Sequence, residues 1–334
     1  RIFEQIKGFG DYGFPESHAA SFALLVYFSA WLKCHEPAAF YCGLLNSQPM
    51  GFYSPSQLVQ DARRHNIEIR PVDIFTSEWE SSLEAPANIY HSRANLSEQP
   101  AIRLGFQRIK GLRKKTAEKI IALRATTPIT NLPSLARLAR LDQGDLDRLT
   151  EGGAFRTLSG HRYQTHWDNK AILTKGAIAA FEDITAFDQI AEKEQIYLTA
   201  PKETDDLRAD YTSLGLTLGR HPMAILREEK PFSQFKTAVD LTQLNHGRFV
   251  QVAGIVTGRQ RPSSASGVIF LTLEDETDNI NIVVWTRVLE AFRTVVVQGR
   301  LLKIKGTMER QGSVIHVIAG HVEDMSQYLE HFSL

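Results

Sequence analysis

The sequence predicts a multidomain α+β protein with a helical first part, a second helical domain and a five-stranded β-barrel near its end. Apolar residues follow helical spacing within residues 1–75 and 101–158, and a turn containing Gly111 interrupts the second of these stretches. Residues 248–325 change to the two-residue period of strands. A length of 334 residues is enough for two or three domains.

The composition is that of an ordinary globular protein. Apolar residues make up 43% and charged residues 23%, which excludes a wholly disordered or collagenous chain. The 38 basic and 38 acidic residues cancel, so only the distribution of charge can indicate a nucleic-acid partner. Two cysteines are too few for a disulfide scaffold and favour a reducing cytosol. Because the chain begins at Arg1 without a leader pattern, we expect a fragment of a longer protein.

The longest apolar stretch predicts a buried helix. It covers residues 19–32 and is too short to cross a bilayer. From His18 to Lys33 the apolar residues surround the helix instead of forming one stripe, which is typical of a core helix. Ser17 stands in the position of its N-cap residue.

Three further elements are expected before residue 75. A second helix is predicted over residues 37–45 and a third over residues 55–64, with Ser54 as N-cap and Pro55 as first helical residue. Residues 67–70 alternate like a short strand. The middle of the chain is then divided into a polar connector, a hairpin-containing domain and a linker or helical region, at residues 76–99, 100–158 and 159–247.

Five strand patterns separated by turn signals occupy residues 248–325. They cover residues 249–256, 268–273, 280–285, 301–306 and 314–322. A helical stretch at residues 286–292 falls between the third and fourth strands. Five strands with a helix in this place follow the order of an OB-fold barrel, and residues 326–334 would form a C-terminal tail.

The most basic stretch of the chain coincides with a hairpin motif. Residues 101–125 hold eight basic residues and one acid, and they include Ile-Lys-Gly-Leu-Arg at residues 109–113. This sequence resembles the hairpin of a helix-hairpin-helix motif, in which apolar-Gly-apolar-Gly joins two helices. Gly111 lets a ligand approach the main chain, and the N–H groups that open the second helix attract a phosphate.

A phosphate contact of this kind holds a duplex without reading its sequence. Arg113 stands where the motif has its second glycine, and it adds a charge suited to phosphate. We therefore predict DNA or RNA contact through Arg108, Lys110, Gly111, Arg113, Lys114 and Lys115, with a solvated basic helix face as the alternative. The helical pair that follows, at residues 132–141 and 146–149, is acidic, and we interpret it as packing support.

The barrel carries basic residues on or beside two of its strands. They predict a groove for single-stranded DNA, because OB barrels bind single strands with basic side chains and aromatic platforms. The residues of this predicted groove are Arg259, Arg261, Lys303, Lys305 and Arg310. Lys303 and Lys305 share one face of their strand, and Ile304 faces the core. Phe270 and Trp285 could stack on bases, but we interpret both as barrel core.

The sequence predicts no catalytic residue and no metal ligand. Cys34, His35 and Cys42 lack metal-ligand spacing, and the two cysteines are interpreted as buried thiols. An acidic cluster follows the second barrel strand and leads into a turn, which favours a solvated rim over a two-metal site. The members of this cluster are Glu274, Asp275, Glu276 and Asp278. No P-loop, dinucleotide fingerprint or nucleophile elbow occurs.

The segments, taken in order, resemble the bacterial C-family DNA polymerases, the group of the replicative polymerase III alpha subunit. Residues 11–45, DYGFPESHAASFALLVYFSAWLKCHEPAAFYCGLL, look like the end of the fingers domain of that family. The resemblance implies that residues 1–75 are the C-terminal part of the fingers. It covers most of the chain but does not extend to about residues 159–205. The matching elements are Phe14 and residues 17–19, 30–33, 37–40, 62–64, 71–74 and 103–111.

Within this family the chain is most similar to the error-prone paralogue used in damage-induced mutagenesis. The similar sequences are LNSQPMGFY at residues 45–53, RQRP at 259–262, GVIF at 267–270 and LEDET at 273–277. The resemblance therefore implies translesion synthesis by the full-length protein, with this chain as its C-terminal, DNA-holding part.

The family transfers nucleotides with two metal ions, and its palm carboxylates lie upstream of the matched region. The resemblance thus implies Mg²⁺ for the full-length enzyme, but no cofactor, catalytic residue or metal ligand in this chain. Ser17 and His18 match the motif nearest the nucleotide, so they are candidates for nucleotide contact, with helix capping and packing as the alternative. The implied partners are duplex and single-stranded DNA, and also a sliding clamp or mutagenesis accessory proteins, in the bacterial cytoplasm and without a membrane.

Two other functions stay open at this point. The chain could be a non-catalytic nucleic-acid-binding adaptor made of the hairpin domain and the barrel. It could also be the same region of the replicative alpha subunit. An aspartate pair upstream of Arg1 would distinguish a polymerase from an adaptor, and sequence beyond Leu334 would distinguish the two polymerases.

Overall fold

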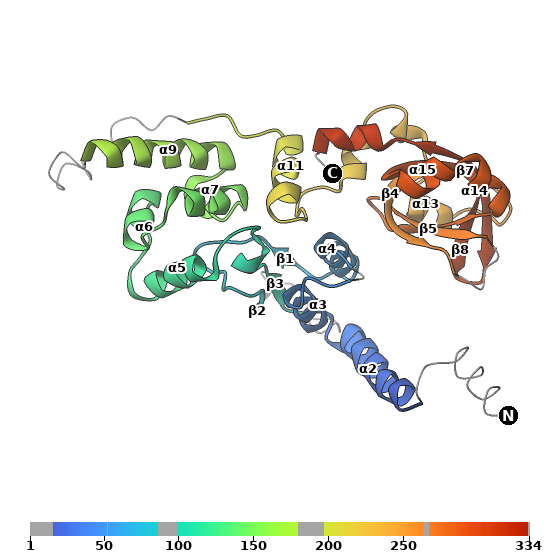
Figure 1. Cartoon of the computed structure of the whole chain (residues 1–334), viewed down its shortest axis with the longest axis horizontal. Coiled ribbons are helices and arrows are strands. Elements are labelled where there is room, and N and C mark those ends of the chain that lie inside the picture. Colours follow the sequence, from blue (N-terminus) through green and yellow to red (C-terminus); the bar gives the residue numbers. More distant parts are fainter. Residues whose placement is uncertain (1–15, 52, 86–98, 180–196, 263–266, 333–334) are drawn as a thin grey trace, which may run out of the picture. The chain divides into compact units, whose positions relative to one another are not determined.

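The computed structural model describes residues 16–51, 53–85, 99–179, 197–262 and 267–332 (Figure 1). The chain divides into two compact units, one of Arg1–Arg108 with Leu112–Thr127 and the other of Ile109–Gly111 with Pro128–Leu334. The first unit is mainly helical, and the second combines helices with a closed β-barrel. The predicted α+β fold class is therefore confirmed.

The first unit contains α2 (Glu16–His35), α3 (Pro37–Asn46), α4 (Pro55–Arg64), β1 (Ile69–Arg70), β2 (Ser82–Glu84), β3 (Ala101–Arg103), the 3₁₀ turn η1 (Phe106–Arg108) and α5 (Lys114–Thr126). Helices α3 and α4 start at the predicted prolines. The Ser54 hydroxyl accepts the N–H of Gln57 at 3.2 Å, and the Gln57 side chain accepts the N–H of Ser54 at 2.9 Å. This reciprocal capping box fixes the start of α4.

A small sheet of strand order β1-β3-β2 follows α4, with β1 parallel and β2 antiparallel to β3. Arg70 and Arg103 both pair with Glu84, at 2.6 and 2.8 Å, and so tie the three strands together. The sequence predicted β1 but not β2 or β3. Strands of three residues are too short to show alternation, and the first of the two lies in a stretch interpreted as a connector.

Helix α2 is exposed, which contradicts the prediction of a buried helix. Eight large apolar side chains between Phe22 and Leu32 are 40–66% exposed. The principal partner of α2 among the described elements is α3, and Figure 1 shows α2 extending beyond it. The described part of the first unit thus supplies no second layer for the apolar surface that the sequence encodes.

Two smaller predictions about this helix are also wrong. Ser17 lies inside α2 instead of capping it, because the helix is already formed at Glu16. Cys34 is exposed, since it lies on the same unburied helix, whereas Cys42 is buried in α3 as predicted. Among the described residues, no helix is both long and apolar enough to cross a membrane.

The second unit begins with helices and continues into the barrel. Its helices are α6 (Leu132–Leu138), α7 (Gln143–Glu151), α8 (Arg156–Ser159), α9 (Arg162–Ala179), α11 (Glu203–Ser213), α12 (Pro222–Leu226), η3 (Phe232–Gln234), α13 (Ala238–Thr242), α14 (Thr286–Ala291), α15 (Arg293–Gln298) and η4 (Ser326–Phe332). Arg162 is buried and pairs with Asp206 at 2.6 Å and with Asp210, so one guanidinium joins α9 to α11. Two carboxylates compensate this buried charge.

The barrel strands are β4 (Phe249–Gln260), β5 (Ile269–Glu274), β6 (Asn279–Val284), β7 (Leu301–Gln311) and β8 (Val314–Asp324). They close in the order β4-β5-β6-β8-β7, with β7 pairing back onto β4. Only β6 and β8 are parallel, so the topology is that of the predicted OB-fold. The predicted helix after the third strand is α14; the sequence did not predict α15.

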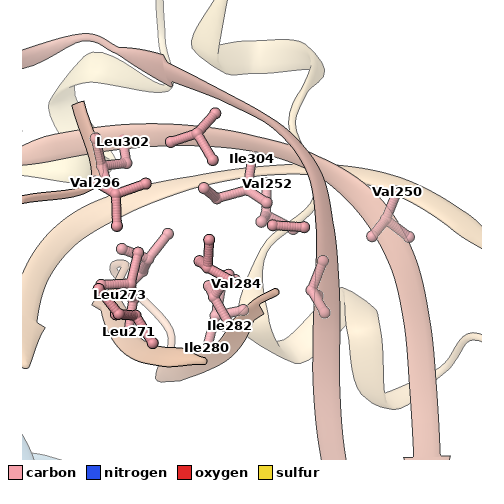
Figure 2. Close-up of a cluster of buried hydrophobic side chains, with 14 of the residues drawn as sticks. Val250, Val252, Leu271, Leu273, Ile280, Ile282, Val284, Val296, Leu302 and Ile304 are labelled. Carbon is pink, nitrogen blue, oxygen red and sulfur yellow. The ribbon is translucent and has the colours of Figure 1, made fainter. Parts of the chain in front are cut away.

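Alternating apolar residues of these strands fill the barrel. Figure 2 shows side chains such as Val252, Leu271, Ile282 and Ile304 pointing toward one another in its interior. Val296 of α15 contributes to the same core cluster. Alternation therefore predicted the inward faces correctly, including that of Ile304 between two lysines.

Three of the four acids at the end of β5 are buried or half-buried instead of forming a solvated rim, which corrects the sequence interpretation, whereas Asp278 is exposed. Glu274 is 4% and Asp275 is 1% exposed. Glu274 accepts a hydrogen bond from Nε2 of His221 at 3.2 Å, and Glu276 pairs with Arg227 through both of its carboxylate oxygens. These contacts attach the segment around α12 to the barrel. They were not predictable locally, since the partners lie about fifty residues earlier in the chain.

Asp275 forms the centre of this acidic hub, defined as Glu274, Asp275 and Glu276. One of its oxygens accepts the N–H of Ala238 at 2.7 Å, at the first residue of α13. The other accepts the N–H and the hydroxyl of Thr277 and the N–H of Asp278, at 2.6–3.0 Å. The carboxylate thus holds α13 against the barrel and shapes the turn between β5 and β6.

Candidate nucleic-acid interface

The hairpin loop has a left-handed backbone at its glycine, which was not predicted from the sequence. Gly111 has φ of +75°, and α5 begins three residues later, at Lys114. Arg113 precedes this helix in an extended conformation without a side-chain cap. The elements before the loop are β3 and the single 3₁₀ turn η1 instead of the predicted helix. Gly105, between them, packs against the main chain of Trp79 and Glu80.

The six predicted hairpin residues differ in their surroundings. Lys114 and Lys115 are exposed at the start of α5, and Arg113 is exposed beside them. Lys110 donates its ammonium to the carbonyl of Tyr211 at 3.0 Å, and its N–H bonds to Ser213 at 2.8 Å. The hairpin tip of the second unit is therefore held by the end of α11.

Arg108 is half-buried. Its Nε atom is buried without a hydrogen-bond partner among the described residues, and burial lowers the pKa of its guanidinium. A desolvated cation without a carboxylate is costly unless an anion reaches it. Arg108 is therefore suited to an anionic ligand.

Two other basic residues of this stretch have structural roles that the charge count concealed. Arg124 donates to the carbonyls of Ile74 and Ser77, at 3.2 and 2.6 Å, and pairs with Glu78. Arg103 belongs to the small sheet through Glu84. Fewer basic side chains are consequently available to a ligand than the eight counted in residues 101–125.

Two of the predicted barrel residues cap helices. Arg259 donates to the carbonyls of Val296, at 2.9 Å, and Gly299 at the end of α15, and burial lowers its pKa. Arg310 donates to three carbonyls at the end of α13, including that of Thr242 at 2.6 Å. A guanidinium at a helix C-terminus satisfies carbonyls that the helix leaves unpaired.

Lys303 and Lys305 lie on the same face of β7, as predicted, but they are not equivalent. Lys303 pairs with Glu323 of β8 at 2.8 Å, and this hydrogen bond holds the pKa of Glu323 below its usual range. Its ammonium also lies 5.3 Å from the ring centre of Phe235. The side chain of Lys305 is half-buried and makes no hydrogen bond or ion pair within the described residues, although its charge also lowers the pKa of Glu323. Arg261 is exposed after β4.

Trp285 is 54% exposed, which contradicts its interpretation as core; Phe270 is half-buried. Trp285 ends the inward alternation of β6 and becomes the residue before α14, so its side chain leaves the barrel. His18 is exposed on α2, and the side chain of Ser17 lies outside the described part of the structure. The nucleotide contact of these two residues stays a prediction.

No group of three or more potential metal ligands occurs among the described residues. The carboxylates of the acidic hub do not fit a Mg²⁺ pair, because their oxygens accept hydrogen bonds from His221, Arg227 and main-chain N–H groups. His166 pairs with Glu151 at 2.8 Å instead of joining a ligand set.

Comparison with protein families gives two matches, each over one part of the chain. Residues 66–165 match a family described as helix-hairpin-helix motif. Residues 250–325 match a family described as OB-fold nucleic acid binding domain. The matches agree with the hairpin around Gly111 and with the closed barrel of β4–β8. Among solved structures, asparaginyl-tRNA synthetase of Pyrococcus horikoshii matches at 22% identity and a TM-score of 0.25, covering 28% of this chain and 23% of that one.

Curated relatives match along nearly the whole chain. Error-prone DNA polymerase of Alkalilimnicola ehrlichii is 50% identical over 98% of this chain. The enzyme of the same name from Teredinibacter turnerae is 51% identical over 100% of it. The chain spans 30% and 32% of the length of these two relatives. Along nearly its whole length the chain is similar to a segment of these error-prone DNA polymerases.

Proposed function

We propose that the chain is the DNA-holding part of an error-prone DNA polymerase that copies damaged templates in the bacterial cytoplasm. The observation that supports this most directly is the hairpin, with Gly111 in the left-handed region and an uncapped, basic start of α5 after it. The names of the relatives supply the polymerase reaction, which belongs to the full-length enzyme.

The hairpin is proposed to hold the phosphate backbone of duplex DNA. Lys110, Arg113 and Lys114 follow one another around Gly111, and the first turn of α5 carries the positive end of the helix dipole. Contacts to phosphates position a duplex without reading bases. Such contacts suit a polymerase, since it must hold every sequence equally well.

The barrel is proposed to bind single-stranded DNA. Trp285 offers an exposed ring for stacking, and Arg261 and Lys305 offer charges that no described hydrogen bond occupies. In the full-length enzyme Mg²⁺ would bind carboxylates elsewhere, because those of the acidic hub hold the barrel together. A sliding clamp and mutagenesis accessory proteins are proposed as partners on the family resemblance alone.

The hairpin proposal predicts a change in salt dependence. Replacing Lys110, Arg113 and Lys114 together with Ala should weaken duplex binding equally on unrelated sequences. The slope of log affinity against log salt should fall by roughly 0.9 for each lost phosphate contact, hence by about 2.7. Fluorescence anisotropy over a salt series measures both. The matched control replaces three exposed basic residues elsewhere in the chain, Lys202, Lys230 and Arg287, with Ala. An unchanged slope in the hairpin variant would mean that Lys110, Arg113 and Lys114 do not contact phosphates and only form a solvated basic face.

The barrel proposal predicts a preference for single strands. Replacing Lys303 and Lys305 with Ala should reduce affinity for a short single-stranded oligonucleotide more than affinity for a duplex. Most of the loss should come from Lys305, because Lys303 is already paired with Glu323. Titration at two salt concentrations, with Lys202 and Lys230 replaced as the control, measures the difference. Equal losses for single strands and duplex would contradict a groove on the barrel.

A further inference from the structure

Arg148 lies against the hairpin, in α7, which is the second helix of the helical pair that follows the hairpin in the sequence. A Cβ atom built on Gly111 would lie 3.2 Å from its Nε atom. A Cβ built on Gly144, in the first turn of α7, would lie 2.9 Å from its Nη1 atom. The guanidinium therefore lies beside the hairpin glycine, in space that is open because both positions lack a side chain.

This guanidinium is unpaired, unlike other half-buried and buried arginines of the second unit. Arg162 and Arg227 each pair with carboxylates, and Arg310 donates to helix carbonyls. Within the described residues, the side chain of Arg148 makes no hydrogen bond, ion pair or ring contact, although it is half-buried. A half-buried arginine whose five donors meet no protein acceptor is suited to an external anion.

Two acids lie near Arg148 in the sequence of α7, and neither pairs with its guanidinium among the described residues. Asp142 caps α7 by accepting the N–H of Asp145 at 2.8 Å. Asp145 is fully buried, one turn before Arg148 on the same helix. Among the described residues, neither acid forms an ion pair or hydrogen bond with the guanidinium of Arg148. Its donors lie beside Gly111 instead.

We propose that Arg148 binds a phosphodiester group of duplex DNA at the hairpin, next to the tip formed by Lys110 and Gly111. This inference rests on the proposed duplex binding of the hairpin. A guanidinium offers two parallel N–H donors, which match two oxygens of a phosphate, and Gly111 allows the phosphate to approach the main chain. The second helical pair would then supply a ligand, in addition to the packing support expected from its acidic sequence.

The test compares Arg148→Ala with Arg137→Ala in the 334-residue chain. Arg137 is an exposed arginine on the neighbouring helix α6, so its loss removes the same charge from the same region. Arg148→Ala should weaken duplex binding roughly tenfold at 0.1 M salt and lower the salt slope by about 0.9. Arg137→Ala should leave both nearly unchanged. Arg148→Lys should keep most of the salt slope but lose several-fold in affinity, since an ammonium lacks the planar fork.

The outcomes separate this inference from the duplex proposal. If the wild-type chain binds no duplex, both are overturned. If it binds and Arg148→Ala behaves like Arg137→Ala, only the role of Arg148 is overturned. If Arg148→Ala lowers the melting temperature and Arg148→Lys restores affinity and melting temperature completely, the arginine is a packing residue and the inference is again overturned. Wild-type melting with reduced affinity and slope supports it.

Discussion

Replacing Asp275 with Ala is expected to lower the free energy of unfolding of the second unit by about 3–5 kcal/mol. The substitution removes the acceptor of four hydrogen bonds, from Ala238, Thr277 (twice) and Asp278. Asp275 is 1% exposed, so water cannot replace it without opening the contact between α13 and the turn after β5. Each donor left without a partner costs about 1–3 kcal/mol, and partial relaxation reduces the sum.

Urea unfolding followed by circular dichroism measures this loss. Asp275→Asn should cost about half as much, because its remaining carbonyl oxygen still accepts while its amide cannot. Glu309→Ala, which removes an exposed carboxylate on β7, is the matched control and should change stability by less than about 0.5 kcal/mol. A loss no greater than that of the control would mean that Asp275 is a solvated rim residue, as its sequence position first indicated.

Replacing Gly306 with Ala is expected to be almost as damaging, with a loss of roughly 3 kcal/mol. Gly306 lies where the pairing of β7 with β8 shifts register, directly after Lys305. A Cβ at this position would overlap the main-chain carbonyl of Ile318 on the paired strand. Backbone cannot move aside as a flexible side chain can, so the bulge itself must distort.

Gly320 provides the matched control, on the opposite strand of the same pair. A Cβ there would lie 3.5 Å from the carbonyl oxygen of Lys305, which is ordinary contact. Gly320→Ala should therefore be nearly neutral in thermal unfolding, whereas Gly306→Ala should melt many degrees lower. Similar melting temperatures for the two variants would show that β7 accommodates the methyl group by sliding.

The sequence predicted those parts of the molecule whose causes are local. Ser54 and Gln57 cap α4 within one turn, and alternation around Ile304 identifies the inner face of β7 without knowledge of any other strand. The barrel topology was predicted from five such strand patterns with a helix between the third and the fourth. The hairpin at Gly111 was also predicted from its local sequence, but the left-handed conformation of the glycine was not.

The remaining features depend on partners far away in the chain. Whether an acid is solvated or buried depends on what reaches it, and His221 reaches Glu274 across 53 positions. Arg259 and Arg310, which stay predicted DNA ligands, also cap helix ends, and a basic strand residue does not reveal in the sequence which helix end it will reach. Arg148 was overlooked for a related reason: the acidic balance of its helix concealed that its own guanidinium is unpaired.

The exposed apolar surface of helix α2 gives the isolated chain a site at which it can adsorb to other apolar surfaces. Eight of its large apolar side chains are exposed, and each Å² of apolar surface removed from water contributes roughly 25 cal/mol. Detergent micelles, chromatography resins and neighbouring copies of the chain can all offer that shelter. We therefore expect this helix to promote self-association of the chain, because a zero net charge provides no compensating repulsion.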